Sequence, residues 1–460
     1  MKQNRSLAIS SKIQELKMGN IISLLYQEFP TSIFDRSYSD ETKTRDRVFT
    51  VNNTLLTMVL TATQQDKTLK NSVSLYYTIH QQNKINIVEE QEKQIAEEIE
   101  QAAQADKRKV GRPKKHTVKL PKSLTKDISL NTSAYSKARN RVPLQLANDL
   151  FLASRIQKAK NVYTHWHGYH VLLGDGTYVQ MQDTESIRKE YEVKHKGKSS
   201  KSYPQGLLEA ITERGTGQLF SFRLVNRHVS ELALFYDMID DLPPKSLLLL
   251  DGLYNCYEII SKCKRKGVEF VVPDKRKRDY KLVEVLADGD EIVEIKTPKN
   301  RSKWLKENEK PNKFLLRRIH CESPDGKKYT LLTSLLDNKI DKNEIQLLYL
   351  TRWDIEISIR EIKIIMNINI LRSKTPEMAL KELTVSLATY NLIRKIIYAS
   401  IKDLPFSPKE DFIYKFYTHN KGLLIDKKGR VYRRWSTGRR RTNPNNPKGN
   451  VTKKKTKQKI

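Results

Sequence analysis

The most constraining stretch of this sequence is SLLLLDG at residues 246–252. Its four consecutive leucines, Leu247–Leu250, would place apolar side chains on both faces of an extended strand. A strand with two apolar faces is typical of the interior of a sheet that helices cover on both sides. Other strand patterns lie at 219–225 and 268–273, and the helical patterns between the strands are at 232–242 and 255–267. We therefore predict a layered α/β fold.

Two acidic residues stand beside glycines at the expected ends of strands. Asp251 ends the apolar run and is followed by glycine. Residues 170–184 predict a strand, a turn at the Gly-Asp-Gly sequence centred on Asp175, and a second strand. Small neighbours would let a large ligand such as DNA approach the backbone closely. Four further acids stand in comparable settings, namely Asp183, Asp274, Asp354 and Glu361.

A third acid of interest lies in the segment YLTRWDIEISIREIK, residues 349–363. Its apolar residues recur at steps of three and four, which predicts an amphipathic helix. On a regular helix four side chains would fall within roughly 60° of one another; they are Tyr349, Arg352, Glu356 and Lys363. A carboxylate among cations suits a metal held beside a phosphate backbone. A solvated helix with salt-bridged charges fits the same spacing equally well.

The three acids could act together if the fold gathers them. Asp175, Asp251 and Glu356 could then hold two Mg²⁺ ions, roughly 3.5–4 Å apart, which stabilise the attacking and leaving oxygens of phosphodiester displacement. Oxygen ligands favour Mg²⁺, or Mn²⁺ as a substitute, over zinc. The acids are far apart in the chain, so their spacing alone does not establish this grouping.

The net charge of +32 points to a polyanionic partner, with nucleic acid as the first candidate and an anionic membrane surface as the competing one. Residues 427–460 contain fourteen Lys or Arg and no acid, which predicts a disordered tail that adds salt-sensitive phosphate contacts. There is no apolar run long enough to span a bilayer and no signal peptide. Three cysteines without a C-x2-C pair predict a reducing cytoplasm and no disulfides or zinc fingers.

The first 156 residues predict helices and basic segments. A charged arm at 88–105 leads into KRKVGRPKKH at 107–116, which resembles an AT-hook. A G-R-P core can lie in a narrow A·T minor groove, where Arg112, Lys114 and Lys115 would contact DNA; a basic linker is the alternative. Residues 131–154 predict a helix broken near Pro143, on which Arg139 could bind DNA or face solvent.

Residues 281–335 predict strands without intervening helices. Alternating strands flank the turn Asp288-Gly289, and the strands KFLLRRIH and KYTLLTSLL follow. We interpret this region as an all-β insertion of roughly sixty residues, judged by the alternation alone. A long amphipathic helix is predicted at 380–401, after the segment that carries Glu356.

Taken together, the motifs resemble the DDE transposases of bacterial insertion sequences, specifically the insertion-sequence-four family. That family's hallmark Y-x2-R-x3-E-x6-K is matched by Tyr349, Arg352, Glu356 and Lys363. Its first acidic motif, DGT followed by DT, is matched at 175–177 and 183–184, and its second is matched by LLLLDGLY, which carries over to Asp251. The resemblance covers roughly residues 50–400.

The resemblance implies an RNase H-like core interrupted by a β insertion, with Asp175, Asp251 and Glu356 as the catalytic and metal-binding triad. It implies that Tyr349, Arg352 and Lys363 contact phosphates near the transferred end. Water would cleave a strand at the element end, and the exposed 3′-OH would then attack a phosphodiester. It also implies a homodimer bridged by double-stranded DNA, at terminal inverted repeats and target, in the bacterial cytoplasm and nucleoid.

We therefore expect five parts: a helical DNA-binding region at 1–156, a first part of the core at 157–275, a β insertion at 276–336, a helical second part of the core at 337–402, and a C-terminal segment with the basic tail at 403–460. The leading hypothesis is a transposase that performs Mg²⁺-dependent cleavage and strand transfer by cut-and-paste. The alternatives are an RNase H-like nuclease without strand transfer and a non-catalytic DNA-binding protein derived from a transposase.

Overall fold

The computed structural model describes most of the chain between residues 48 and 401. The described residues are 25, 28–34, 48–105, 129–156, 164–191, 202–299, 313–322, 326, 328–401, 424–425 and 431–432. The chain divides into two compact units, Met1–Glu410 and Asp411–Ile460. In the second unit the described residues form one antiparallel pair, β11 (Leu424–Ile425) with β12 (Val431–Tyr432). Everything below concerns the first unit.

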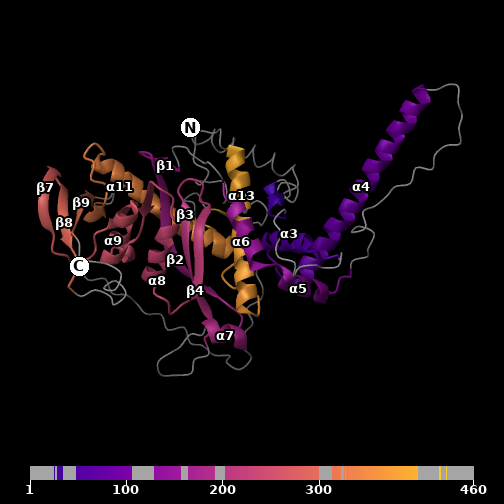
Figure 1. The fold of residues 1–460 in the computed structure, drawn as a ribbon, viewed down its shortest axis with the longest axis horizontal. Helices are drawn as coiled ribbons and strands as arrows, with labels where there is room; N and C mark the ends of the chain where they lie inside the picture. The colour runs from indigo at the N-terminus through magenta and orange to yellow at the C-terminus, as the bar shows by residue number, and fades with distance from the viewer. Residues whose placement is uncertain are drawn as a thin grey trace, which may run out of the picture. The chain divides into compact units, whose positions relative to one another are not determined.

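A ten-stranded mixed sheet organises the first unit (Figure 1). The parallel pairs β2–β5 and β5–β6 form its middle, and the other neighbours in the sheet are antiparallel. The predicted α/β class is therefore confirmed. From one edge to the other the strands are β4 (Leu219–Asn226), β3 (Gln205–Glu213), β2 (Tyr169–Gln180), β5 (Ser246–Leu249), β6 (Glu269–Pro273), β10 (Lys328–Thr333), β9 (Lys313–Glu322), β8 (Asp290–Lys296) and β7 (Lys281–Ala287), with the short β1 (His165–Trp166) paired to β2.

Helices cover both faces of the central strands, as the leucine run predicted. Leu248 and Leu250 pack in a cluster with α8 (Glu231–Met238) and α9 (Tyr257–Lys266). Leu247 and Leu249 point the other way and pack with α11 (Lys342–Leu350) and α12 (Asp354–Arg360). Successive side chains of a strand alternate between faces, so one run of leucines supplies both cores.

The turn predicted at Gly174-Asp175-Gly176 is wrong, because β2 runs without interruption through these residues. The two glycines make room for side chains inside the molecule. A Cβ at Gly174 would lie 2.5 Å from Cε2 of Phe235, and one at Gly176 would lie 2.7 Å from Oε2 of Glu209. The small residues beside Asp175 therefore serve internal packing, and the expected approach of a ligand to this backbone is not their explanation.

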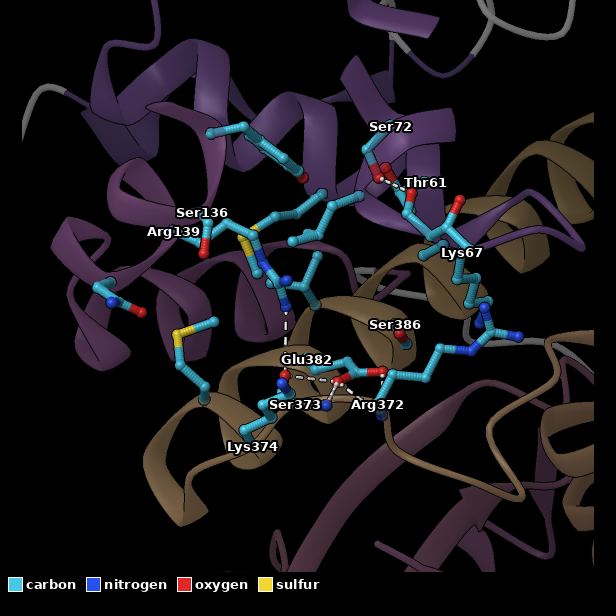
Figure 2. Close-up of a pocket in the computed structure, with 18 of the residues that line it drawn as sticks. Thr61, Lys67, Ser72, Ser136, Arg139, Arg372, Ser373, Lys374, Glu382 and Ser386 are labelled. Atoms are coloured by element: carbon cyan, nitrogen blue, oxygen red, sulfur yellow. Dashed lines mark hydrogen bonds between the residues drawn. The ribbon is translucent and has the colours of Figure 1, made fainter. Parts of the chain in front are cut away.

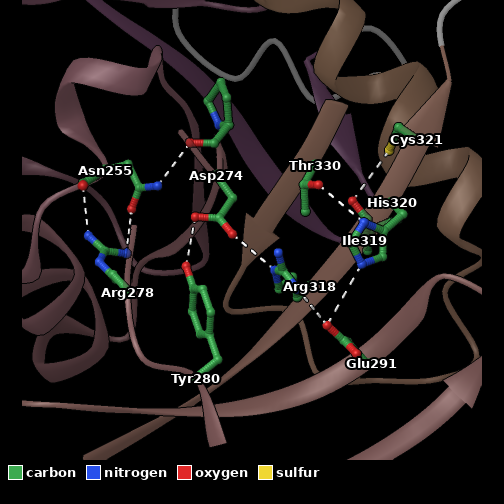
Figure 3. A network of polar contacts seen from close by, with 11 residues as sticks. Asn255, Asp274, Arg278, Tyr280, Glu291, Arg318, Ile319, His320, Cys321 and Thr330 are labelled. Atoms are coloured by element: carbon green, nitrogen blue, oxygen red, sulfur yellow. Dashed lines mark hydrogen bonds and ion pairs between the residues drawn. The ribbon is translucent and has the colours of Figure 1, made fainter. Parts of the chain in front are cut away.

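The predicted β hairpins are present, but they extend the main sheet. β10 pairs with β6 in an antiparallel ladder, so the strands from β7 to β10 continue the sheet that contains β2 and β5. Gly289, with a φ of +67°, makes the β7–β8 turn. A polar network fastens the join (Figure 3): Asp274, just after β6, accepts hydrogen bonds from Arg318 of β9 at 3.0 Å and from the hydroxyl of Tyr280 at 2.7 Å.

The helices outside the sheet come from both ends of the first unit. Residues before β1 form η1 (Thr31–Phe34), α3 (Val51–Ala62), α4 (Leu69–Ala105), α5 (Thr132–Arg141) and α6 (Leu144–Ala153), and α7 (Glu185–Tyr191) follows β2. The predicted break near Pro143 separates α5 from α6. The long α13 (Pro376–Ile401) packs against α3 and α6. Its Asn391 binds the backbone of Leu219, accepting from the N–H at 2.8 Å and donating to the carbonyl at 3.0 Å.

Some of the sequence predictions concern residues outside those described. These are the AT-hook-like segment with Arg112, Lys114 and Lys115, and most of the basic tail. Within the described ranges, no helix combines the length and the apolar character needed to cross a membrane.

Candidate active site

The two aspartates of the predicted triad meet on neighbouring strands. The parallel register of β2 and β5 pairs Leu173 with Leu249, so Asp175 and Asp251, two residues further on, reach the same level of the sheet. β5 ends at Leu249 while β2 continues. By strand alternation both aspartates belong to the face that packs against α11 and α12. Asp251 caps the 3₁₀ turn η4 (Gly252–Tyr254), accepting from the N–H of Leu253 at 2.6 Å.

The segment that carries Glu356 lies on this same face but is not one regular helix. It consists of α11, a 3₁₀ turn η5 (Thr351–Trp353), α12, and a π-helical turn η6 (Glu361–Ile365). The single regular helix predicted for 349–363 is therefore wrong. Turns of 3.0 residues and π turns rotate the chain differently from an α-helix, so they reset the angles between side chains. π turns inside helices occur frequently at functional sites.

Two of the four predicted side chains on this segment bind residues of the β2 and β5 region. The hydroxyl of Tyr349 donates to the carbonyl of Leu250 at 3.2 Å, next to Asp251. Nζ of Lys363 donates to Oγ1 of Thr177 at 3.0 Å, two residues beyond Asp175. The segment is thus fixed to both β5 and β2.

Arg352 connects Glu356 to the aspartates. Its Nη2 donates to Oε1 of Glu356 at 2.9 Å, and its side chain is 10% exposed against 41% for Glu356. The positive charge of Arg352 also lowers the pKa of Asp175, although it does not dominate there. Burial raises the pKa of Asp175 to about 6, and the negative charge of Asp251 adds to this rise. The site therefore holds a carboxylate that lacks a sufficient counter-charge.

The fit of these residues to a divalent metal ion is partial in this structure. Asp175 and Asp251 supply oxygen ligands at one level, and the raised pKa of Asp175 shows that a nearby cation would relieve an unfavourable charge. Glu356 instead faces Arg352. Among the described residues, no group of three or more His, Cys, Asp or Glu side chains is gathered closely enough to hold a metal. The Glu356 carboxylate would have to come closer to the two aspartates to complete a three-carboxylate site.

Comparison with known proteins bears on this arrangement. The family model described as "Transposase DDE domain" matches residues 166–392, which include all three acids. The chain is 28% identical over 273 residues to "Transposase InsG for insertion sequence element IS4" of Escherichia coli (strain K12). Both matches support a DDE transposase of the insertion-sequence-four family. The aligned part makes up 57% of this chain and 60%, less than two thirds, of that transposase.

A solved structure is also similar to this chain, at a low level. It is the cryo-EM structure of a piggyBac transposase synaptic complex with hairpin DNA, matched with a TM-score of 0.38 and 12% identity over 87% of this chain and 77% of that one. A TM-score of this size does not establish a shared fold.

Behind Asp175, on the other face of β2, the DDE domain contains a second acidic cluster. The hydroxyl of Tyr254 lies 2.7 Å from Oε1 of Glu209 and 2.8 Å from Oε1 of Glu231. One hydroxyl carries one proton, so both hydrogen bonds can form only if one carboxyl is protonated. Burial raises the pKa of Glu209 to about 9, which identifies Glu209 as the protonated group.

The sequence patterns did not reveal this cluster. Glu209 lies on β3, a strand that they did not predict, and its partners belong to η4 and α8. The one residue in the sequence that could have indicated this cluster was Gly176. Register pairs Gly176 with Glu209, and a side chain at 176 would collide with both Glu209 and Glu231.

The other acids singled out in the sequence have separate partners. Asp183 accepts from Arg188 and Asp274 from Arg318, and Glu361 is buried against Arg394 at 2.6 Å. Asp354 lies on α12, and its charge raises the pKa of Arg214, against the larger lowering by burial. Arg139 lies on α5, away from β2 and β5, and donates to Oγ of Ser373 at 3.2 Å.

Proposed function

We propose that this chain is a transposase that binds the ends of its insertion sequence and catalyses Mg²⁺-dependent DNA strand cleavage and strand transfer by cut-and-paste. The observation that carries the proposal is the alignment of Asp175 and Asp251 at one level of the parallel β2–β5 pair, with the Glu356 segment packed on the same face. Two aspartates and the segment that carries Glu356, from distant parts of the chain, thus share one face of a domain that matches the family's model.

The arrangement of strands supports an RNase H-like core. In the order β4-β3-β2-β5-β6, the pairs β4–β3 and β3–β2 are antiparallel. The pairs β2–β5 and β5–β6 are parallel. This is the order and direction expected for an RNase H-like sheet. In this proposal the core consists of 157–275 and 337–402, β7 to β10 form the insertion at 276–336, residues 1–156 bind DNA, and 403–460 add the basic tail.

In the proposed reaction Asp175, Asp251 and Glu356 are the metal ligands. Bound Mg²⁺ or Mn²⁺, as two ions, would supply charge stabilisation for the attacking and leaving oxygens. Arg352 would release Glu356 and turn its guanidinium to a DNA phosphate, since a guanidinium binds carboxylate and phosphate oxygens with the same geometry. Lys363 and Tyr349, which bind Thr177 and the carbonyl of Leu250, would hold the strand backbone beside the aspartates.

The proposed partners are double-stranded DNA, as terminal inverted repeats and target, and a second copy of the chain. A net charge of +32 supports association with a polyanion. Arg139 and the AT-hook-like residues Arg112, Lys114 and Lys115 are further proposed DNA contacts.

The first prediction tests the catalytic assignment. Glu356→Gln keeps the size of the side chain and removes its charge, so strand cleavage at the element end should fall by at least about a thousandfold while binding to that end is retained. Gel analysis of a labelled element end, with Mg²⁺, measures cleavage, and a metal-free shift assay measures binding. The matched control is Glu344→Gln, an exposed glutamate of α11, which should cleave normally.

The products separate the proposal from its alternatives. Joined element–target molecules identify a transposase, and cleaved ends without joining identify a nuclease. Binding without any cleavage by the wild-type protein would leave only a DNA-binding protein derived from a transposase. Normal cleavage by Glu356→Gln would refute the catalytic assignment.

A further inference from the structure

A cavity of about 560 Å³ lies outside the β2–β5 site, between the helices that precede the sheet and those that follow it (Figure 2). Its walls come from α3, from the start of α4, from α5, from residues 372–375 and from α13. Pockets of this size hold organic molecules rather than single ions. Of the residues that line it, Arg139 alone has a role proposed so far, as a DNA contact.

The cavity is basic. Four cations line it, namely Lys67, Arg139, Arg372 and Lys374, and the lining includes one carboxylate, Glu382. That carboxylate is already engaged. It accepts from the backbone N–H of Arg372 at 3.0 Å and of Ser373 at 2.8 Å, and from the hydroxyl of Ser373 at 2.6 Å. Glu382 therefore holds residues 372–373 in place, and its single negative charge is outnumbered by the four cations of the lining.

Two of the four cations have no acidic partner within the described ranges. Arg139 donates to Oγ of Ser373 at 3.2 Å, and neither it nor Lys374 forms an ion pair there. Arg372 has a distant acidic partner, since its Nη1 lies 3.9 Å from Oδ1 of Asp66. Lys67 donates to the carbonyl of Met366. The cavity thus offers a guanidinium and an ammonium to an anion.

The remaining lining is partly apolar and partly hydrogen-bonding. Met58, Tyr135, Met378 and Val385 supply apolar surface. Ser136 and Asn140 also line the cavity, and because they are four residues apart on α5 they share one side of that helix. A ligand that matches this lining is anionic at one end and has a flat or apolar body, as a nucleotide does.

The cavity is connected through the backbone to the strand of Asp175. At the end of β2, Gln180 donates to the carbonyl of Asn369 at 2.9 Å and accepts from the N–H of Leu371 at 2.9 Å. The hydroxyls of Thr184 and Ser186 both donate to the carbonyl of Lys374, at 2.7 and 2.9 Å. The backbone at Lys374 is therefore tied to the segment that follows the strand of Asp175.

We infer that this cavity binds a phosphodiester of the substrate DNA together with its nucleoside, with Arg139 and Lys374 on the phosphate. The inference rests on the proposed function, because it assigns a second contact to the same DNA. It separates a specific phosphate site from the general attraction that a basic chain exerts on DNA.

Fluorescence anisotropy with a labelled 30-base-pair duplex of the element end, in EDTA, tests this assignment. Arg139→Gln and Lys374→Gln should each weaken binding roughly tenfold, as expected for loss of a charged hydrogen bond, and reduce the slope of log K against log salt by about 0.9. The matched control is Lys137→Gln, an exposed cation of α5 outside the cavity, which should change affinity less than twofold. Arg139→Lys, with its charge retained, should recover part of the loss if the variants are folded.

Each opposing result has a definite meaning. Equal losses of DNA affinity in Arg139→Gln, Lys374→Gln and Lys137→Gln would show that the cavity residues act only through their positive charge. That result would overturn the inference. Thymidine 5′-monophosphate binding as tightly as the duplex would make it a free-nucleotide site, which also overturns it. The anisotropy assay contains no metal, so it measures binding apart from cleavage. If the wild-type protein binds through the cavity but never cleaves when Mg²⁺ is present, that result would count against the proposed function alone. Normal binding by Arg139→Gln, with normal cleavage and joining by wild-type protein, would count against this inference alone.

Discussion

Asp175 is a proposed metal ligand whose ionisation the fold changes. Its pKa is raised to about 6 by burial first and by Asp251 second. A metal ion competes with the proton for a carboxylate. Apparent Mn²⁺ affinity should therefore be constant above about pH 7 and fall as pH drops through 6, approaching tenfold per unit well below it.

Calorimetric titration with Mn²⁺ between pH 5 and 7.5 measures this dependence. Asp183→Asn is the control, since Asp183 is paired with Arg188 and should leave both affinity and profile unchanged. Affinity that does not vary between pH 5 and 7 would show that Asp175 is not a ligand.

Glu209 gives a prediction about stability. Its pKa in the folded chain, about 9, lies above the ordinary value of 4.5, so the folded state holds a proton that the unfolded state releases. Stability contributed by this protonated state is present below pH 4.5 and is lost progressively as pH rises toward 9. Glu209→Gln should remove this loss, so the variant should gain more than about 1 kcal/mol relative to wild type between pH 5 and 9.

Urea unfolding at pH 5, 7 and 9 measures the difference. Glu284→Gln, an exposed glutamate on β7, should follow the wild-type curve. If Glu209→Gln and wild type have parallel pH profiles, Glu209 is ionised in the folded protein and the hydrogen-bond assignment at Tyr254 is wrong.

At the level of elements, Arg317 fastens β9 to its surroundings. It binds both oxygens of Asp290 on β8, at 2.8 and 2.5 Å, and donates to the carbonyls of Asp337 and Ile340 before α11. Both charged side chains are almost fully buried. The β hairpins and the segment leading to Glu356 therefore share one guanidinium.

Arg317→Met should destabilise the first unit by about 3–5 kcal/mol, because it leaves the Asp290 carboxylate buried without a partner. Urea unfolding measures the loss. The double variant Arg317→Met/Asp290→Leu should recover much of it, since no unpaired charge remains. Equal stability of the single and double variants would show that the carbonyl contacts, and not the ion pair, account for the effect.

The elements also show what the sequence could and could not predict. The leucine run predicted a covered central strand ending at Asp251, because apolar periodicity is local information. The alignment of Asp175 with Asp251 depends on the pairing of β2 with β5, and α7, β3, β4 and α8 separate these strands in the chain. The glycines beside Asp175 were misread as a turn, because the side chains that need the space belong to β3 and α8.

At the scale of the whole molecule, the charge is divided between two compact units. The second unit, Asp411–Ile460, contains the stretch 427–460 with fourteen basic residues and no acid. A chain ending at Glu410 should unfold at the same temperature as the full chain, because the sheet and its two cores lie in the first unit. It should bind non-specific duplex DNA more weakly, with a salt slope shallower by about 0.9 for each DNA phosphate that the tail neutralises.

Differential scanning calorimetry and anisotropy over a salt series check these two outcomes. An unchanged salt slope in the chain ending at Glu410 would mean that the tail does not bind DNA phosphates.

The hydroxyl of Tyr254 has a consequence that reaches beyond its two glutamates. It has one proton to give and two carboxyl oxygens to satisfy, so the chain must take up a proton from the buffer when it folds at neutral pH. The heat of unfolding should consequently differ between buffers of large and small ionisation enthalpy, by about one buffer ionisation enthalpy for each proton released.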